Sequence, residues 1–209
     1  MHGVEGADVV AAAELFSAAV ARVDEGWGRR AGALDWTCRR TLDHCVDVLA
    51  LYAAHLASRA GRPLPWPRRG DPSASIQELR LSLVSGAHVL AAVVREAPPE
   101  ARAFHPAGMA DAEGFAAMAV DELLVHADDV TQTLGLELRP PEELCARALA
   151  RLFPWAAALV NEGEGSWRAL LWANGRIPLD TRAQLGGEWV WWAAPVGEWD
   201  GETVPVWRG

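Results

Sequence analysis

The chain has 209 residues, a formal net charge of −9, 51% hydrophobic and 22% charged residues, which is typical of a folded globular protein. All 19 basic residues are arginine, so a lysine Schiff base, a lysine general base and a lysine-containing P-loop are excluded. The acidic balance argues against nucleic acid as a partner, because a surface that binds nucleic acid needs positive charge to neutralise phosphates.

The sequence carries no sign of export or membrane insertion. Its three cysteines, Cys38, Cys45 and Cys145, lack C-x-x-C spacing and are odd in number, which favours a reducing compartment over a disulfide framework. No basic stretch followed by an apolar core opens the chain, and no apolar run reaches the roughly 18–20 residues that span a bilayer. We therefore expect a cytoplasmic monomer or homodimer with no membrane partner.

Apolar residues recur at helical spacing through the first 136 residues, between clusters of glycine and proline. The four helices expected from this pattern cover residues 7–29, 37–59, 73–95 and 112–134. Thr37 is expected to be the N-cap of the second helix, and a loop through Pro106 and Gly108 to precede the fourth. Similar helix lengths and short to moderate connections predict a mainly α fold built on an antiparallel four-helix bundle.

The character of the sequence changes after Pro141. A fifth helix is expected over residues 142–160, and a sixth, which could instead be a strand, from Ser166 to its stop at Gly175. Two short strands are expected at 189–192 and 204–207.

Tryptophan is concentrated in this second part, since eight of the eleven tryptophans lie at or after Trp155. Such uneven use predicts a small aromatic-packed unit that docks on the bundle. We therefore expect two domains, a metal-binding bundle at 1–138 and a tryptophan-rich α+β subdomain at 139–209.

The expected fourth helix carries ionisable side chains along one stripe, with Glu122, His126 and Asp129 at positions i, i+4 and i+7. Its solvent side is expected to carry the polar residues Asp121, Asp128 and Gln132. The stripe then borders the core, where ionisable groups are costly to bury unless they are paired or bind a metal. An E-x-x-x-H pair on one helix face can chelate a metal, although it could equally be an ordinary helix pair.

A third ligand has to come from another helix, and His44 of the second helix is the candidate. It shares a stripe with His55, whereas Asp43 and Asp47 are expected on the solvent side. His55 lies roughly 16 Å further along the axis, so both histidines cannot bind one ion. The alternative for His44 is a hydrogen-bonded histidine at the edge of the core.

Two segments, Trp36–His44 (WTCRRTLDH) and Glu122–Asp129 (ELLVHADD), resemble the DinB/YfiT-like superfamily. The resemblance is to its mycothiol-dependent maleylpyruvate isomerase-like branch, and LLWANGR (170–176) with WAAPVGEW (192–199) is similar to the C-terminal region of that branch. The likeness spans most of the chain, although each motif is short. Asp128 stands where the family has tryptophan, which alters the expected pocket wall.

This resemblance implies a bundle that holds a divalent metal, typically zinc, through His44, Glu122 and His126. Asp129 matches the family aspartate and would orient a ligand or the helix. The implied activity is a thiol-dependent transferase or isomerase, in which the thiolate of mycothiol binds the metal and attacks a small electrophilic substrate.

Several alternatives remain open at this stage. The same metal site could activate water in a hydrolase, or the bundle could bind a metal or ligand without catalysis. Arg176 and Arg182 are candidates to bind a substrate carboxylate as bidentate forks, and Arg176 is taken as a catalytic candidate with Asp129. Cys45 is interpreted as a core residue rather than a nucleophile.

Overall fold

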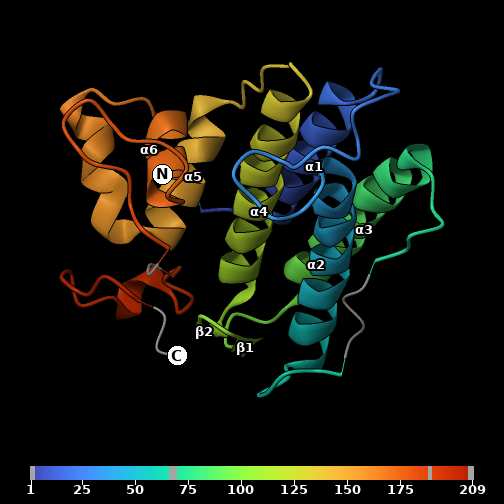
Figure 1. The fold of residues 1–209 in the computed structure, drawn as a ribbon. Coiled ribbons are helices and arrows are strands. Elements are labelled where there is room, and N and C mark those ends of the chain that lie inside the picture. The colour runs from blue at the N-terminus through green and yellow to red at the C-terminus, as the bar shows by residue number, and fades with distance from the viewer. Residues whose placement is uncertain (1–2, 66–69, 188–189, 207–209) are drawn as a thin grey trace.

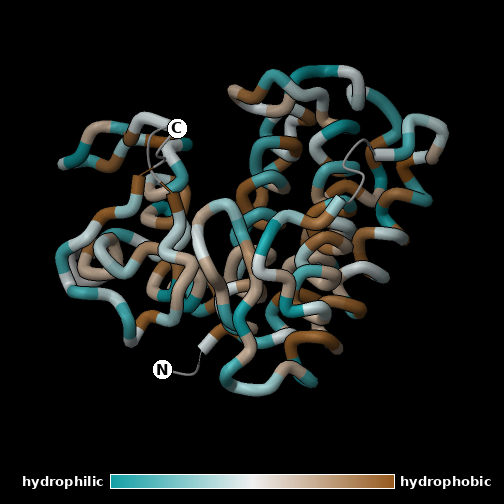
Figure 2. Tube along the Cα trace, turned by 90° about the horizontal axis from the view of Figure 1, so that it is seen from below, coloured by the Kyte–Doolittle hydropathy of each residue, from teal (hydrophilic) through white to brown (hydrophobic). Residues whose placement is uncertain are grey.

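The computed structural model describes residues 3–65, 70–187 and 190–206 (Figure 1). Four long helices pack on one another as a bundle, which confirms the mainly α fold. They are α1 (Gly6–Ala19), α2 (Cys38–Ser58), α3 (Ile76–Glu96) and α4 (Ala112–Thr133). Hydrophobic and hydrophilic stretches alternate along the chain, as expected where helices turn one side to a shared core and the other to solvent (Figure 2).

The helices begin where side chains satisfy their free backbone N–H groups. Thr37 caps α2 as predicted, and Asp111 caps α4; each accepts a hydrogen bond from the N–H three residues later, at 3.1 and 2.8 Å. Ser75 and Glu78 form a capping box at the start of α3. The two helices that carry the candidate ligands therefore start at residues fixed by local sequence.

Helix α1 ends well before the predicted residue 29. The chain turns after Ala19, and the indole N–H of Trp27 donates to the carbonyl of Val23 at 3.0 Å, which brings Trp27 back into the core. Gly26 adopts a positive φ of 87°, which favours glycine at that turn. The segment that was expected to extend the helix instead forms a loop leading to α2.

Helix α4 lies at the centre of the molecule. Every residue from Gly114 to Thr131 except Glu122 is buried. The prediction that Asp121 and Asp128 face solvent is therefore wrong, since they are 1% and 6% exposed; Gln132 is exposed as expected. The reason is that the C-terminal part of the chain covers the side of α4 left open by the bundle (Figure 1).

The prediction of a solvent-facing Asp43 on α2 is also wrong. Asp43 is 3% exposed because the segment between α2 and α3 passes over it, where the backbone N–H of Asp71 donates to both carboxylate oxygens at 3.1 and 3.2 Å. Asp47 is half-buried and accepts a hydrogen bond from the N–H of Gly70 at 3.1 Å.

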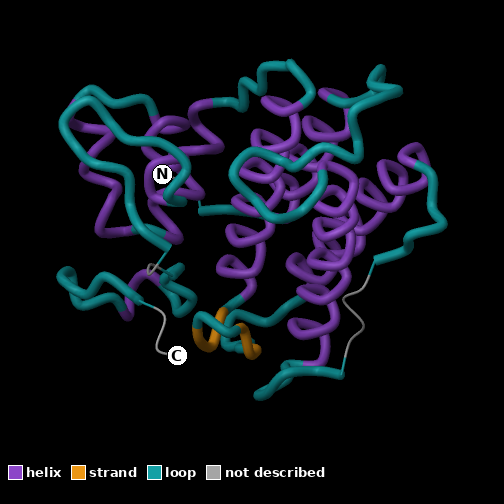
Figure 3. The backbone as a smooth tube through the Cα atoms, viewed as in Figure 1, coloured by secondary structure: helices purple, strands orange, loops and turns teal. Residues whose placement is uncertain are grey.

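A small hairpin precedes α4 where the sequence predicted only a loop (Figure 3). Strands β1 (Ala103–His105) and β2 (Gly108–Ala110) pair antiparallel, with Phe104 opposite Met109. The hairpin is too short to form a layer of its own, and it packs against α2. It brings His105 to the end of the bundle, where that ring contacts the C-terminal region.

The C-terminal region is helical in its regular parts. Helix α5 (Glu142–Leu152) is followed by the 3-10 helix η1 (Pro154–Glu162), by α6 (Ser166–Ala173) and by a short 3-10 turn, η2 (Val196–Glu198). The predicted fifth helix breaks at Phe153 because the residue before a proline disfavours helical backbone. The sixth helix is confirmed as a helix rather than a strand.

The two strands expected at 189–192 and 204–207 are not formed by the described residues of these runs. One backbone hydrogen bond, from the N–H of Val190 to the carbonyl of Pro205 at 3.1 Å, joins the two segments. Trp189 and Trp207 lie outside the described residues.

The C-terminal region docks on the bundle through α5, which packs against α4. Arg151 of α5 is 2% exposed, and it donates to the Asp111 carboxylate at 2.6 Å and to the carbonyls of Trp192 and Ala193 at 3.1 and 3.2 Å. Arg151 thereby connects helix α5 to the start of α4 and to the segment at residues 192–193. Within the described ranges, no helix has the length and apolar character needed to cross a bilayer.

Candidate metal centre

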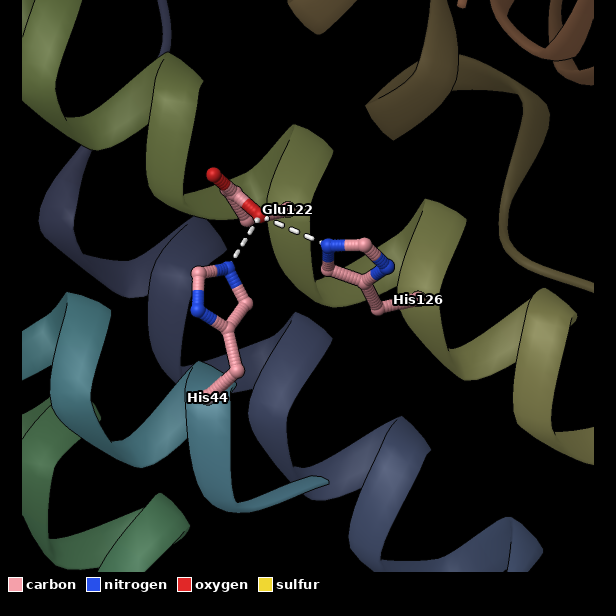
Figure 4. Close-up of side chains that lie close together, drawn as sticks. All are labelled: His44, Glu122 and His126. Atoms are coloured by element: carbon pink, nitrogen blue, oxygen red, sulfur yellow. Dashed lines mark ion pairs between the residues drawn. The ribbon is translucent and has the colours of Figure 1, made fainter. Parts of the chain in front are cut away.

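His44 of α2 and the pair Glu122 and His126 of α4 converge where the two helices pack (Figure 4). One potential ligand atom from each residue lies within 4.8 Å of the others. Oε2 of Glu122 lies 3.4 Å from Nε2 of His44 and 3.0 Å from Nε2 of His126. A tetrahedral zinc ion with bonds of about 2.0–2.1 Å holds its ligand atoms about 3.3 Å apart, and both distances from Glu122 are close to this value.

The donor set matches a catalytic rather than a structural metal site. Two imidazoles and one carboxylate supply three ligands, which leaves a coordination position for water or a substrate. The side chains of His44, Glu122 and His126 are 18%, 15% and 11% exposed, so the group is largely buried but still reached from solvent. Among the residues that the structure describes, this is the one cluster of His, Cys, Asp and Glu with metal-binding spacing.

A hydrogen bond fixes the orientation of the His126 ring. Nδ1 of His126 lies 3.1 Å from Oδ2 of Asp129. An ionised carboxylate can only accept, so the hydrogen is on Nδ1 and the Nε2 atom faces Glu122. Asp129, which the sequence placed on the same stripe, therefore supports the ligand instead of joining the triad.

Arg176 holds Asp129 from the opposite side. Its Nε and Nη2 atoms donate to the two carboxylate oxygens, each at 2.9 Å, and Nη1 donates to the carbonyl of Asn174 at 3.1 Å. Arg176 was expected to bind a substrate carboxylate; that role stays a prediction, and the contact seen here is with Asp129. Arg182, the other candidate, is exposed.

The charges in this network shift one another's pKa values. Burial alone would raise the pKa of Glu122, but hydrogen bonds from His126 and His44 hold it well below its usual range. Burial alone would lower the pKa of His126, but its hydrogen bonds to Asp129 and Glu122 raise it to about 9. Burial would also raise the pKa of Asp129, which His126 and Arg176 nevertheless lower. Without metal, the site therefore favours ionised carboxylates around a protonated His126.

A small cavity of about 170 Å³ opens beside two of the ligands. Its walls come from α4 and from the C-terminal region, through residues Asp121, Glu122, Val125, His126, Asn174, Arg176 and Trp191. The cavity is the space next to the triad in which a small molecule could be held. A larger groove of about 630 Å³, between the start of α1 and the end of α3, contains none of the three ligands.

Asp121 and Trp191 are site residues that the sequence reasoning missed. The buried Asp121 carboxylate accepts hydrogen bonds from Nδ2 of Asn174 at 2.8 Å and from the indole N–H of Trp191 at 2.9 Å. Burial raises the pKa of Asp121 to about 7, although both hydrogen bonds act to lower it. One available signal was the first half of α4, because residues 114–120 (GFAAMAV) carry no polar side chain on any face, which is the pattern of a fully surrounded helix.

Trp36 forms the outer wall of the centre. Its ring centroid lies 4.7 Å from that of His44 and 6.3 Å from that of His126, and the side chain is partly exposed. The loop before α2 is held on α4 because Thr133 Oγ1 accepts from the N–H of Gly32 and donates to the carbonyl of Arg30, both at 2.9 Å. The Trp36 contact was not expected from the sequence.

Cys45, next to His44, is 1% exposed and lies in the core, as interpreted. Burial raises the pKa of its thiol well above the usual value, and the charges of Glu122 and Asp129 raise it further. A thiolate nucleophile at Cys45 is therefore disfavoured.

Compared with models of known protein families, with curated proteins and with solved structures, the chain matches none of them. The metal centre accordingly stands on the geometry of the chain's own residues. Membership of the DinB/YfiT-like superfamily stays a prediction.

Proposed function

We propose that this chain is a zinc-dependent transferase or isomerase. In this proposal the thiolate of a small cofactor, mycothiol, attacks a small electrophilic substrate. The observation that carries the proposal is the convergence of His44, Glu122 and His126, with potential ligand atoms within 4.8 Å of one another. Three protein ligands and an open position are typical of catalytic zinc. The choice of mycothiol rests on the resemblance of the two ligand motifs.

Zinc, when bound, supplies Lewis acidity that lowers the pKa of a bound thiol or water and polarises a carbonyl. The chain's own residues create the setting for that chemistry. Asp129 keeps the hydrogen of His126 on Nδ1, which directs Nε2 towards Glu122, and Arg176 balances the charge of Asp129. The carboxylate of Glu122 offsets part of the charge of a divalent ion, so a thiolate can still be attracted to the centre.

The surroundings suit a reaction between two small molecules. Trp36 covers the centre on the solvent side, and the cavity of about 170 Å³ lies beside Glu122 and His126. A site from which bulk water is largely removed strengthens the attraction between a metal and a thiolate. In the transfer reaction, the sulfur–carbon bond forms as the leaving-group bond breaks, and the leaving group takes up the proton lost by the thiol.

The metal assignment is tested by metal analysis of the purified protein. We expect about one zinc ion per chain in the wild type, and less than about a tenth of that in His44→Ala. His88→Ala is the matched control, because His88 is an exposed histidine of α3 outside the triad. Equal metal content in wild type and His44→Ala would overturn the proposal.

The thiol is tested separately, by turnover of electrophiles with and without added mycothiol, together with the absorption of the cobalt-substituted protein. We expect turnover that requires the thiol, and a thiolate-to-cobalt absorption band when the thiol binds. Turnover that is equal without thiol would indicate a hydrolase. Loss of thermal stability on chelation, with neither turnover nor thiol binding, would indicate a structural metal.

A further inference from the structure

The C-terminal region forms one side of the cavity beside the metal centre. Trp191, Asn174 and Arg176 contribute to its walls opposite the ligands of α4. Its volume of about 170 Å³ is well below the ~300–1,000 Å³ of pockets that hold drug-sized ligands. The space between these walls, next to Glu122 and His126, is therefore the size of a small chemical group.

Trp191 is held in this wall by contacts from three parts of the chain. Its indole N–H donates to Oδ2 of Asp121 at 2.9 Å, and its ring centroid lies 5.5 Å from that of His105 of the hairpin, with the two rings tilted by 40°. The backbone beside it is also fixed, since the N–H of Trp192 donates to the carbonyl of Leu152 at 2.9 Å. A side chain so constrained cannot swing aside without losing several interactions.

The hydrogen bond to Asp121 links this wall to the metal ligands. Asp121 directly precedes Glu122 on α4, is 1% exposed, and also accepts from Asn174 at 2.8 Å. Its two oxygens thus receive donors from two separate segments of the C-terminal region. Because Asp121 and Glu122 are neighbours on α4, this hydrogen bond ties the Trp191 ring to the helix that carries the ligand.

We infer that Trp191 limits the size of the molecule that can occupy the cavity beside the metal centre, and that Asp121 anchors it there. This inference rests on the proposed function, because it assumes that the substrate lies next to the ion held by the triad. The substrate is then a small electrophile that presents a short, non-aromatic group to the ion. Replacing the indole by a small side chain opens the cavity to larger ligands.

The test uses the full-length protein loaded with cobalt(II), and two hydroxamates as metal-binding probes. Acetohydroxamate carries a methyl group where benzohydroxamate carries a phenyl ring. Their dissociation constants are measured from the change in the cobalt absorption spectrum, for wild type, Trp191→Ala and Trp199→Ala. Trp199 is the matched control, a tryptophan of the same region whose indole donates to the carbonyl of Thr203 rather than lining the cavity.

We expect the wild type to bind acetohydroxamate at least about tenfold more tightly than benzohydroxamate. Trp191→Ala should reduce this ratio of dissociation constants by at least about tenfold, which is the size of effect that the shape of a pocket exerts on binding. Trp199→Ala should keep the wild-type ratio. An unchanged ratio in Trp191→Ala would overturn the inference, even with cobalt bound normally. Absence of a cobalt spectrum in the wild type would instead refute the metal centre, and the inference with it.

Should Trp191→Ala fail to fold, Trp191→Leu keeps an apolar side chain of intermediate size. Its circular dichroism spectrum checks the fold, and the same ratio of dissociation constants decides the outcome. A preference for acetohydroxamate that is weaker than in the wild type supports the inference, whereas the wild-type ratio overturns it.

Discussion

Asp129 accepts the Nδ1 hydrogen of His126 at 3.1 Å, and this one bond determines which ring nitrogen faces the candidate metal position. Arg176 donates a hydrogen bond to each oxygen of the same carboxylate, both at 2.9 Å. Because Arg176 belongs to the C-terminal region and His126 to α4, docking of that region is tied to the orientation of a metal ligand. The C-terminal region is thus part of the metal centre as well as a cover for it.

Replacing Asp129 by asparagine should weaken zinc binding by about 10–100-fold, the usual effect of removing a group that orients a ligating histidine. The amide is neutral and no longer balances Arg176, so His126 becomes a weaker and less well-oriented ligand. The measurement is zinc affinity by competition with a chromophoric chelator.

Asp128→Asn is the control for that substitution. Asp128 is also buried on α4, but it accepts a hydrogen bond from Gln132 at 2.5 Å instead of one from a ligand. We expect its zinc affinity to stay within about threefold of wild type, which is less than the loss of about 10–100-fold expected when a ligand-orienting group is removed. If both variants bind zinc equally well, the orienting role of Asp129 is wrong.

Zinc binding should release about one proton per ion at neutral pH, because zinc needs an unprotonated Nε2 on His126. Burial lowers the pKa of His126, but Asp129 and Glu122 raise it to about 9, so the metal-free protein holds this proton. Since the folded-state pKa is raised, the proton stabilises the metal-free fold fully below the ordinary value of 6.5, and this is lost as pH rises through 9.

The apparent zinc affinity should accordingly rise by about tenfold per pH unit up to about pH 9 and then level off. Calorimetric titrations in buffers with different ionisation enthalpies measure the proton count directly. A binding enthalpy that is independent of the buffer would contradict the prediction, since it means that Nε2 already lacks its proton in the metal-free protein.

All three cysteines should resist thiol reagents in the native protein. Cys38, Cys45 and Cys145 are buried, and burial raises the pKa of each thiol, that of Cys145 to about 12. The reactive thiolate is therefore scarce at neutral pH. Titration with a chromogenic disulfide should detect no thiol before denaturation and all three afterwards; rapid reaction of Cys45 would reopen its role as a nucleophile.

The convergence of His44, Glu122 and His126 was accessible from sequence because helical periodicity is a local property. The i, i+4 spacing places Glu122 and His126 on one face of α4, and the N-cap at Thr37 sets where His44 lies along α2. Antiparallel packing then brings those two turns together.

The way in which the C-terminal region covers the centre could not be predicted from the sequence, because it depends on contacts between distant segments. The predicted solvent side of α4 assumed that one face of the helix meets water. Asp121 is instead enclosed by Asn174 and Trp191, which follow it by more than fifty residues. The contact of the Trp36 ring with His126 likewise joins two segments that are distant in the sequence.

Arg151 offers a test of how firmly the C-terminal region is attached. Arg151→Met keeps much of the side-chain volume but removes the donors to Asp111 and to two carbonyls of the tail. Breaking a buried ion pair by removing one partner costs about 3–5 kcal/mol, so we expect the free energy of unfolding in urea to fall by that amount.

Arg147→Met is the comparison, because Arg147 of α5 pairs with Asp8 at 2.5 Å but is 24% exposed, so water screens this pair more and we expect a smaller loss of stability. Equal losses in the two variants would show that Arg151 is not the main attachment. If Arg151→Met unfolds in two separate transitions, the C-terminal region melts before the bundle, and the division predicted near residue 138 becomes measurable. Because Arg176 and Trp191 would leave with that region, the first transition should also weaken zinc binding.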